Sequence, residues 1–313
     1  MSRIHEALKK AEQERAATQG GGMQPNFATT PVAEPPVFAE RPAEAVAPAA
    51  PAMGHPGMPA FGSPFNTDTL LARCAQLEWN PPDPATMLFL NGDDSARGTE
   101  EFRTLRSRLY HLREKMPLKK LLVTSAEPKE GKSFTSSNLA QVMVRQHGRR
   151  VLLIDADLRN PRLDTMLGTA SDPGLSEYLL GKNDEFSIMQ RGPLENLFFI
   201  PSGTKAADPA ELVGNGRLKL LLQRVEPLFD WIIIDSPPAV WFSDASVLAK
   251  ACDGVLMVVK SNSTPFDKAR KARQEFPDQA LVGVVLNGTR EESLPYARYY
   301  YESYQKKPAT TKV

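Results

Sequence analysis

Residues 121–140 read LLVTSAEPKEGKSFTSSNLA, and the order of these residues sets the architecture of the chain. An apolar run typical of a buried strand leads into a polar loop that ends in Gly131-Lys132-Ser133, and a predicted helix comes next. In such an arrangement, backbone N–H groups of the loop and the N-terminus of the helix face bound phosphates. The stretch therefore predicts a nucleotide-binding site.

The layout assigns individual roles. Lys132 is expected to reach the β- and γ-phosphates of ATP, and Ser133 is expected to bind Mg²⁺. The usual first glycine of the pattern is replaced by Ala126. The residues expected around the phosphates are Ala126, Glu127, Pro128, Lys129, Glu130, Gly131, Lys132, Ser133 and Phe134.

Three aspartates strengthen the prediction. VLLIDADLRNP ends a predicted strand in Asp155 and Asp157, and DWIIIDSPP ends another in Asp235. Carboxylates at the carboxyl ends of parallel strands point into the ligand crevice, where hard oxygen ligands suit Mg²⁺ shared with phosphates. An aspartate in such a place can also cap a helix, but three after a phosphate loop favour an active site. We expect Asp155 and Asp235 to join Ser133 in binding Mg²⁺.

The rest of the chain fits an α/β fold. Buried-strand runs alternate with helical patterns, which predicts a three-layer P-loop fold with a mainly parallel sheet. Residues 67–293 are expected to form this domain. Residues 1–18 predict a short amphipathic helix, either a frayed terminus or a docking helix. Residues 19–66, rich in Pro, Ala and Gly, predict a disordered linker, and residues 294–313 form a Tyr-rich tail.

Composition narrows the classes of protein. The formal net charge of +1 gives no support for nucleic-acid binding. Two cysteines indicate no disulfide framework and fit a reducing cytoplasm. Apolar runs of about six residues fall short of the roughly 20 that span a bilayer, and the N-terminus lacks a signal-peptide core. A cytoplasmic protein without a membrane span is therefore expected.

Several motifs together resemble the bacterial tyrosine kinases of capsule and exopolysaccharide synthesis. The matching stretches are AEPKEGKS, LLIDADLR, IIIDSPP with Asp244 in FSDA, DPGLSEYLLG and PSGTKAADPAEL, and the resemblance covers about residues 85–304. MSRIHEALKKAEQ is similar to the start of a subgroup linked to exopolysaccharide operons. The resemblance implies an autophosphorylating tyrosine kinase that uses ATP and Mg²⁺ and regulates polymer synthesis or export.

Two other functions remain as alternatives. Partition-type positioning ATPases share the fold and the acidic motifs, but they usually carry a second lysine where this chain has Glu127. A non-catalytic scaffold with a regulatory nucleotide site is the other alternative. The departure at Glu127 favours the kinases over the partition ATPases.

The helix predicted over TEEFRTLRSRLYHL, residues 99–112, carries an apolar stripe of Phe102, Leu105, Leu109 and Leu112. Glu100, Arg103 and Arg106 lie on roughly the opposite side. Such a charged face is usually solvated, but Glu-x-x-Arg-x-x-Arg at this place resembles the self-association motif of the family. The resemblance implies a homo-oligomer that can close into a ring.

Five of the seven tyrosines fall in the tail, at Tyr296, Tyr299, Tyr300, Tyr301 and Tyr304. The resemblance implies that they are autophosphorylation sites for the active site of a neighbouring subunit, with Lys132, Asp155, Asp157 and Asp235 as the catalytic group. Asp155 and Asp157 are the candidates to accept the tyrosine proton. Phosphates would outweigh the basic charge of the tail, so we expect modification to loosen the assembly. A membrane-embedded chain-length-determinant-type partner that recruits the kinase to the inner membrane face is also implied.

Three further expectations concern single residues. Asn287 in VVLNG either approaches the adenine, by resemblance to related nucleotide-binding proteins, or forms a simple turn. Arg159 is expected to contact phosphate or a neighbouring subunit. Trp231 and Trp241 are expected to pack in the interior.

Overall fold

The structure is a computed structural model that describes residues 66–90, 98–146 and 148–289. These residues make up the α/β domain. The predicted N-terminal helix of residues 1–18, nearly all of the linker and the tail with its five tyrosines lie outside the described residues.

A single mainly parallel sheet runs through the domain in the order β1-β4-β5-β3-β6-β2-β7-β8. The only antiparallel pairing among the described strands joins β4 to β5. The strands are β1 (Ala75–Gln76), β2 (Lys120–Ser125), β3 (Val151–Asp155), β4 (Gln190–Arg191), β5 (Leu197–Ile200), β6 (Trp231–Asp235), β7 (Gly254–Lys260) and β8 (Leu281–Asn287). The prediction of a mainly parallel α/β sheet is confirmed.

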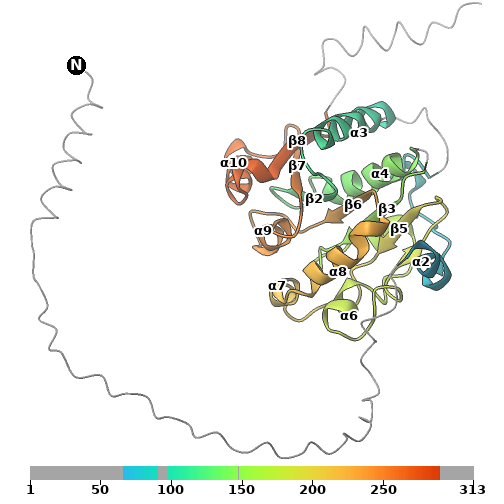
Figure 1. Ribbon diagram of the computed structural model, residues 1–313. Helices are drawn as coiled ribbons and strands as arrows, with labels where there is room; N and C mark the ends of the chain where they lie inside the picture. Colours follow the sequence, from blue (N-terminus) through green and yellow to red (C-terminus); the bar gives the residue numbers. More distant parts are fainter. Residues whose placement is uncertain (1–65, 91–97, 147, 290–313) are drawn as a thin grey trace, which may run out of the picture. The chain divides into compact units, whose positions relative to one another are not determined.

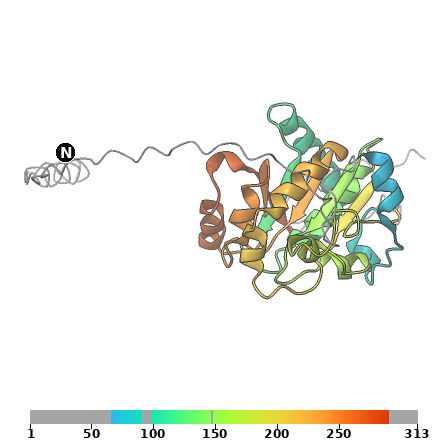
Figure 2. The ribbon, with the colours of Figure 1, turned by 60° about the horizontal axis from the view of Figure 1, so that its bottom comes forward.

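Helices cover both faces of this sheet (Figures 1 and 2). One face packs against α3 (Thr99–Arg113), α4 (Lys132–Val144) and α5 (Leu163–Leu167). The opposite face packs against α2 (Thr67–Arg73), α6 (Leu175–Leu179), α7 (Pro209–Gly214), α8 (Arg217–Val225), α9 (Asp244–Ala249) and α10 (Phe266–Gln274). Three short 3-10 helices complete the described elements: η1 (Pro84–Thr86), η2 (Glu226–Leu228) and η3 (Asp278–Ala280).

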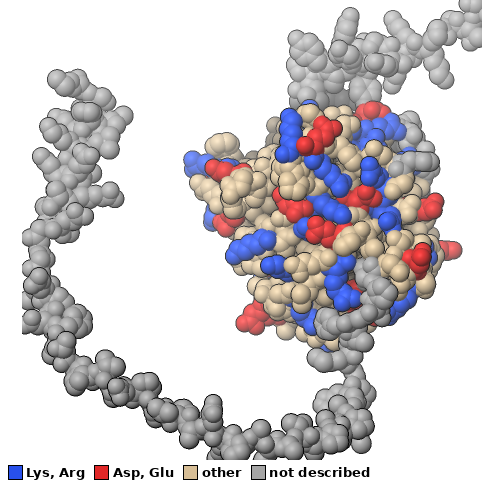
Figure 3. Space-filling view, viewed as in Figure 1, with Lys and Arg blue, Asp and Glu red and all other residues tan. Residues whose placement is uncertain are grey.

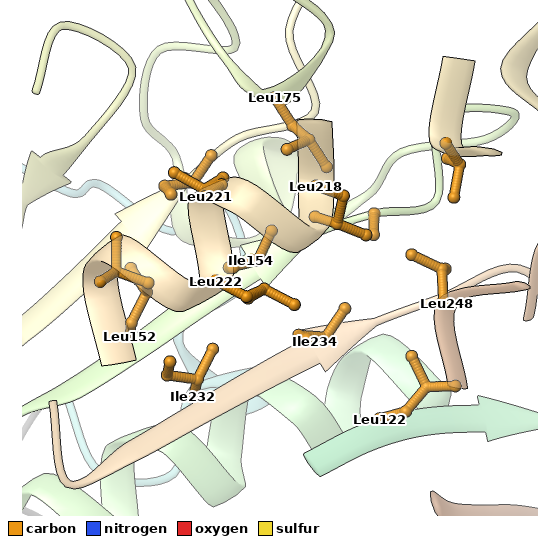
Figure 4. Close-up of a cluster of buried hydrophobic side chains, with 14 of the residues drawn as sticks. Leu122, Leu152, Ile154, Leu175, Leu218, Leu221, Leu222, Ile232, Ile234 and Leu248 are labelled. Atoms are coloured by element: carbon orange, nitrogen blue, oxygen red, sulfur yellow. The ribbon is translucent and has the colours of Figure 1, made fainter. Parts of the chain in front are cut away.

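The alternation of side chains along each central strand builds two separate cores. Leu153 and Ile233 point to the α3–α4 face, whereas Ile154 and Ile234 point to the α8–α9 face. Figure 4 shows the second cluster, in which Leu221 and Leu222 of α8 lie over the strands. Strands buried on both faces need apolar residues at every position, which explains the unbroken runs in the sequence.

Helix α4 is buried nearly all round, although its sequence KSFTSSNLAQVMV is half polar. Its polar residues are hydrogen-bonded rather than solvated. The Asn138 side chain accepts the Leu88 N–H at 2.9 Å, and Gln141 accepts the Phe89 N–H at 3.2 Å. Buried polar groups are tolerated because each has a hydrogen-bond partner. Here these bonds hold residues 88 and 89 against the helix.

The carboxyl end of β2 is the switch point of the fold. From β2 the chain crosses through α4 to β3, which lies toward one edge of the sheet. β7 instead pairs with β2 on the side toward the other edge. Ligands of open α/β sheets bind at such points. β6 ends beside β2 and β3 ends beside β6, so the topology places Asp235 and Asp155 near the loop that begins after Ser125.

Two features differ from the expectation of uniformly buried strands. β8 is an edge strand on which Val284 and Leu286 are 54% and 58% exposed. β1 and β4 have two residues each, too short to leave an apolar signature. Across residues 66–90, 98–146 and 148–289, no helix has the length and apolarity needed to cross a membrane. Acidic and basic side chains are interspersed on the face drawn in Figure 3.

The inward and outward leucines give a test of this core. Leu153→Ala removes a fully buried side chain, and we expect it to lower the free energy of unfolding by about 2–5 kcal/mol. The matched Leu286→Ala, on the exposed edge strand, should cost less than about 1 kcal/mol. Urea unfolding of the full chain, monitored by circular dichroism, measures both. Equal losses would contradict the assignment of β3 to the core and of β8 to the edge.

Candidate nucleotide site

The loop between β2 and α4 has a backbone that only certain residues can adopt. Lys129 and Gly131 have positive φ values of 65° and 96°. A Cβ on Gly131 would lie 2.0 Å from Nδ2 of Asn287, so this position requires glycine on steric grounds as well. Gly131 is also the N-cap of α4 and offers no side-chain cap, so the first N–H groups of the helix are available to an anion.

Glu130 holds this loop in shape. Its buried carboxylate accepts the Glu127 N–H at 2.7 Å and the Thr264 hydroxyl, which comes from the turn before α10. Its backbone carbonyl accepts the Asn287 side-chain amide at 2.9 Å. The phosphate loop is therefore fastened to two neighbouring segments by one residue. Asn287 lies at this site, where its side chain supports the loop.

Lys132 lies among the aspartates that the sequence singled out. Its ammonium group is 2.7 Å from an Asp157 oxygen and 3.6 Å from an Asp235 oxygen. The Ser133 hydroxyl donates to Asp235 at 2.6 Å, and the Ser136 hydroxyl donates to the other Asp235 oxygen at 2.9 Å. The structure therefore brings together the strand ends and the loop, as the sequence pattern predicts. The contact of Ser136 with Asp235 has no signal in that pattern.

Asp155 has a different environment from the other two aspartates. One of its oxygens accepts the N–H groups of Arg162 and Leu163 at 3.2 and 3.1 Å, and the other accepts the Asp157 N–H at 3.1 Å. The backbone donors thus fix Asp155 at the base of the turn that carries Asp157. The side chain of Asp157 is the one that reaches Lys132.

Burial changes the pKa values of the charged side chains around Lys132. Desolvation, with a further contribution from repulsion by Asp235, raises the pKa of Asp155 to about 7. Desolvation also raises the pKa of Asp235, although Lys132 opposes the shift. Desolvation by itself would lower the pKa of Lys132, but Asp235 and Asp157 outweigh it and raise this pKa above its ordinary value. Lys132 is therefore the charged partner that the carboxylates depend on.

The donor set suits a hard cation shared with phosphates. Within the described residues, no cluster of three or more His, Cys, Asp or Glu side chains is arranged to hold a metal by itself. A hydroxyl and a carboxylate, Ser133 and Asp235, lie together at the start of α4. Mg²⁺ is commonly bound by one or two protein oxygens together with substrate phosphates and waters, so these residues fit it.

A second layer of contacts surrounds the loop. Arg159 forms a bidentate pair with Asp244, at 2.7 and 3.0 Å, and its guanidinium lies 4.2 Å from the ring centroid of Phe242. Lys268 of α10 lies 3.5 Å from a Glu127 carboxylate oxygen. The sequence pattern gave no signal for Thr264 or Lys268, because each comes from a segment far along the chain.

Trp231 and Trp241 behave differently. Trp231 is fully buried, as expected, but Trp241 is 57% exposed, so the prediction that it packs in the interior is wrong. Trp241 lies in the turn after Asp235, where its backbone N–H donates to the Pro238 carbonyl at 3.4 Å. Its side chain remains largely in solvent.

The predicted helix over residues 99–112 is confirmed as α3, with Phe102 and Leu109 buried. Glu100 and Arg103 form an ion pair with each other on its outer side. Arg106 instead donates to the Val142 carbonyl at 3.0 Å, which ties α3 to α4. A surface hollow of about 660 Å³, apart from the phosphate loop, runs along α3 and includes Glu100 and Arg103.

These features are those of a P-loop nucleotide-binding protein with an acidic crevice beside the phosphate loop. A family model described as an AAA domain matches residues 126–267. The tyrosine-protein kinase YwqD of Bacillus subtilis is 33% identical over 204 residues, which cover 64% of this chain and 86% of that protein. The tyrosine-protein kinase CpsD of Streptococcus agalactiae is 33% identical over 65% of this chain and 90% of its own length.

Solved structures agree with these relatives. The kinase domain of the Escherichia coli tyrosine kinase ETK matches with a TM-score of 0.60 and 30% identity, over 65% of this chain and 80% of that one. The chain belongs to the bacterial tyrosine-protein kinase family. The resemblance drawn from the motifs is confirmed, and the kinase interpretation is favoured over the partition-type alternative.

The support of the loop by Thr264 is testable. Thr264→Val keeps the shape of the side chain but removes the hydroxyl that Glu130 accepts, leaving a buried carboxylate short of a donor. We expect ATP affinity to fall about fivefold to tenfold, equivalent to roughly 1–1.4 kcal/mol. Isothermal titration with MgATP measures it, and Thr165→Val on the exposed side of α5 is the matched control. Unchanged affinity in both variants would mean that the contact does not shape the loop.

Proposed function

We propose that this protein is an ATP-dependent tyrosine autokinase that transfers the γ-phosphoryl group to its own tail tyrosines. The observation that carries the proposal is the position of Lys132, held 2.7 Å from Asp157 and 3.6 Å from Asp235 at the end of the phosphate loop. Its family relatives are named tyrosine-protein kinases, which supports kinase activity.

The residues divide into groups by their contacts. Residues Ala126–Phe134 would surround the phosphates, with Lys132 neutralising charge on the β- and γ-phosphates. Ser133 and Asp235 would bind Mg²⁺, which when present offsets the negative charge of the transferring group. Asp157, whose carboxylate lies beside Lys132, would accept the tyrosine proton, and Asp155 would hold the turn that positions Asp157.

The proposed acceptors are Tyr296, Tyr299, Tyr300, Tyr301 and Tyr304, presented by a neighbouring subunit. Glu100 and Arg103 are the paired charged residues of α3 that would contact this neighbour, and Arg106 would hold α3 in place. Phosphorylation would add about −1.5 to −2 charges for each tyrosine and so loosen the assembly. Equal oligomer distributions of modified and unmodified protein in sedimentation would contradict this last step.

The proposed process is regulation of exopolysaccharide or capsule polymerisation and export, with a membrane-embedded activator of the chain-length-determinant type. This part rests on the resemblance of the motifs to kinases of that process. Co-purification of the full chain with the cytoplasmic segments of such an activator, and stimulation of tyrosine labelling by it, would test the partnership. Failure of both would remove it.

Labelled ATP gives the central test of the proposed reaction. With Mg²⁺ and γ-labelled ATP, we expect label on Tyr296–Tyr304, located by mass spectrometry. Lys132→Met should lower the initial rate about 100-fold or more, because an aligned charge on the transferring group is lost. Lys182→Met, at an exposed lysine, is the control. Phosphate release without labelled protein would support a partition-type ATPase, and binding without either would support a scaffold.

The role of α3 is tested by Arg103→Glu. Reversing this charge places two acidic side chains side by side on the outer face, at the site of the Glu100 pair. We expect a shift of the full chain toward smaller species in sedimentation velocity. Lys182→Glu keeps the same change in net charge away from α3 and should leave the distribution unchanged. An unchanged distribution for Arg103→Glu would exclude this face as an interface.

A further inference from the structure

The turn after Asp235 is fastened to the end of β2. The Ala239 N–H donates to the Ser125 carbonyl at 2.8 Å, and the Thr124 hydroxyl donates to the Pro237 carbonyl at 3.0 Å. Ser125 is the residue directly before the phosphate loop. These bonds hold the turn, and with it Trp241, at the edge of the nucleotide site.

The ring of Trp241 is connected to the phosphate loop through Lys268. The Lys268 ammonium lies 5.5 Å from the centroid of this ring and 3.5 Å from a Glu127 carboxylate oxygen, so it bridges the ring and the loop. Even with this contact, Trp241 is 57% exposed. Tryptophan is highly buried on average, so most of this ring is unusually accessible, and it is open to pack against an aromatic ligand.

The other aromatic residue of the turn has a different role. Phe242 lies against the guanidinium of Arg159, which is paired with the buried Asp244. Its ring is therefore engaged within the chain, beside the turn that carries Asp157. Trp241 is the aromatic residue of this turn that keeps most of its surface in solvent.

We propose that Trp241 binds the ring of the acceptor tyrosine from the tail of a second copy of this chain. The proposal rests on the proposed autokinase function and adds the residue that recognises the acceptor. Five tyrosines within residues 296–304 supply aromatic rings, which gain from packing edge-on or offset against tryptophan. Arg298, between the first two tyrosines, complements the partly exposed carboxylate of Glu127.

The test separates binding of the acceptor from transfer. A fluorescent peptide of residues 294–307 is titrated, in the presence of Mg²⁺ and a non-hydrolysable ATP analogue, into full-length chains whose five tail tyrosines are serine. We expect Trp241→Ala to weaken peptide binding about tenfold and Trp241→Phe to stay within about threefold of the parent. Melting temperatures within about 2 °C of the parent would show that both variants fold.

Each outcome has one meaning. Equal peptide affinity in the parent and Trp241→Ala, or no binding to the parent, would overturn the proposal. A loss of affinity for the ATP analogue in Trp241→Ala, with peptide affinity unchanged, would assign the ring to the adenine and overturn it too. If the peptide binds through Trp241 but ordinary MgATP never labels it, the proposed kinase function fails while the binding role stands.

Discussion

Three carboxylates and one ammonium group share a site from which water is largely excluded, and the rest of the fold is arranged around that constraint. If all three aspartates were ionised, one lysine would leave two negative charges uncompensated. Burial reduces part of this charge imbalance, because it raises the pKa of Asp155 to about 7 and so favours the neutral carboxyl. Hydrogen bonds stabilise the remaining carboxylate charge, with Ser133, Ser136 and backbone N–H groups as the donors. The negative charge that remains makes the site electrostatically favourable for a divalent cation, as the proposed binding of Mg²⁺ requires.

The fold brings these groups together by topology rather than by local sequence. β3 and β6 end in register, with Asp155 opposite Asp235, and β6 runs beside β2. The side chains of both strands are committed to two cores, so neither strand can slide by one residue without turning its apolar set to the wrong face. The precision of the crevice therefore derives from packing on both sides of the sheet. The loop adds its own support through Glu130, which connects it to the turn before α10 and to the end of β8.

Much of this arrangement could be predicted from the sequence, because the relevant signals are local. A strand, a glycine-lysine-serine loop and a helix are contiguous, and the aspartates come directly after apolar runs. The contacts of Thr264, Lys268 and Asn287 with the loop could not be predicted in the same way, since they join segments more than 100 residues apart. The exposure of Trp241 has a related cause. Composition favours burial of tryptophan, whereas the turn that carries it is fixed by backbone bonds to β2 that leave its ring outside.

The bond from Asn287 to the phosphate loop also sets the starting point of the C-terminal segment. Asn287 ends β8 with its amide on the Glu130 carbonyl, so the chain leaves the domain beside its own nucleotide site. Tyr296 comes nine residues later, and such a tether extends to at most about 30 Å. A segment of that length, starting there, is long enough for Tyr296, the first proposed acceptor, to reach the crevice of its own subunit. The length of this segment alone therefore does not restrict the proposed transfer to a neighbouring subunit, and in the proposed assembly the orientation of the subunits would have to do so.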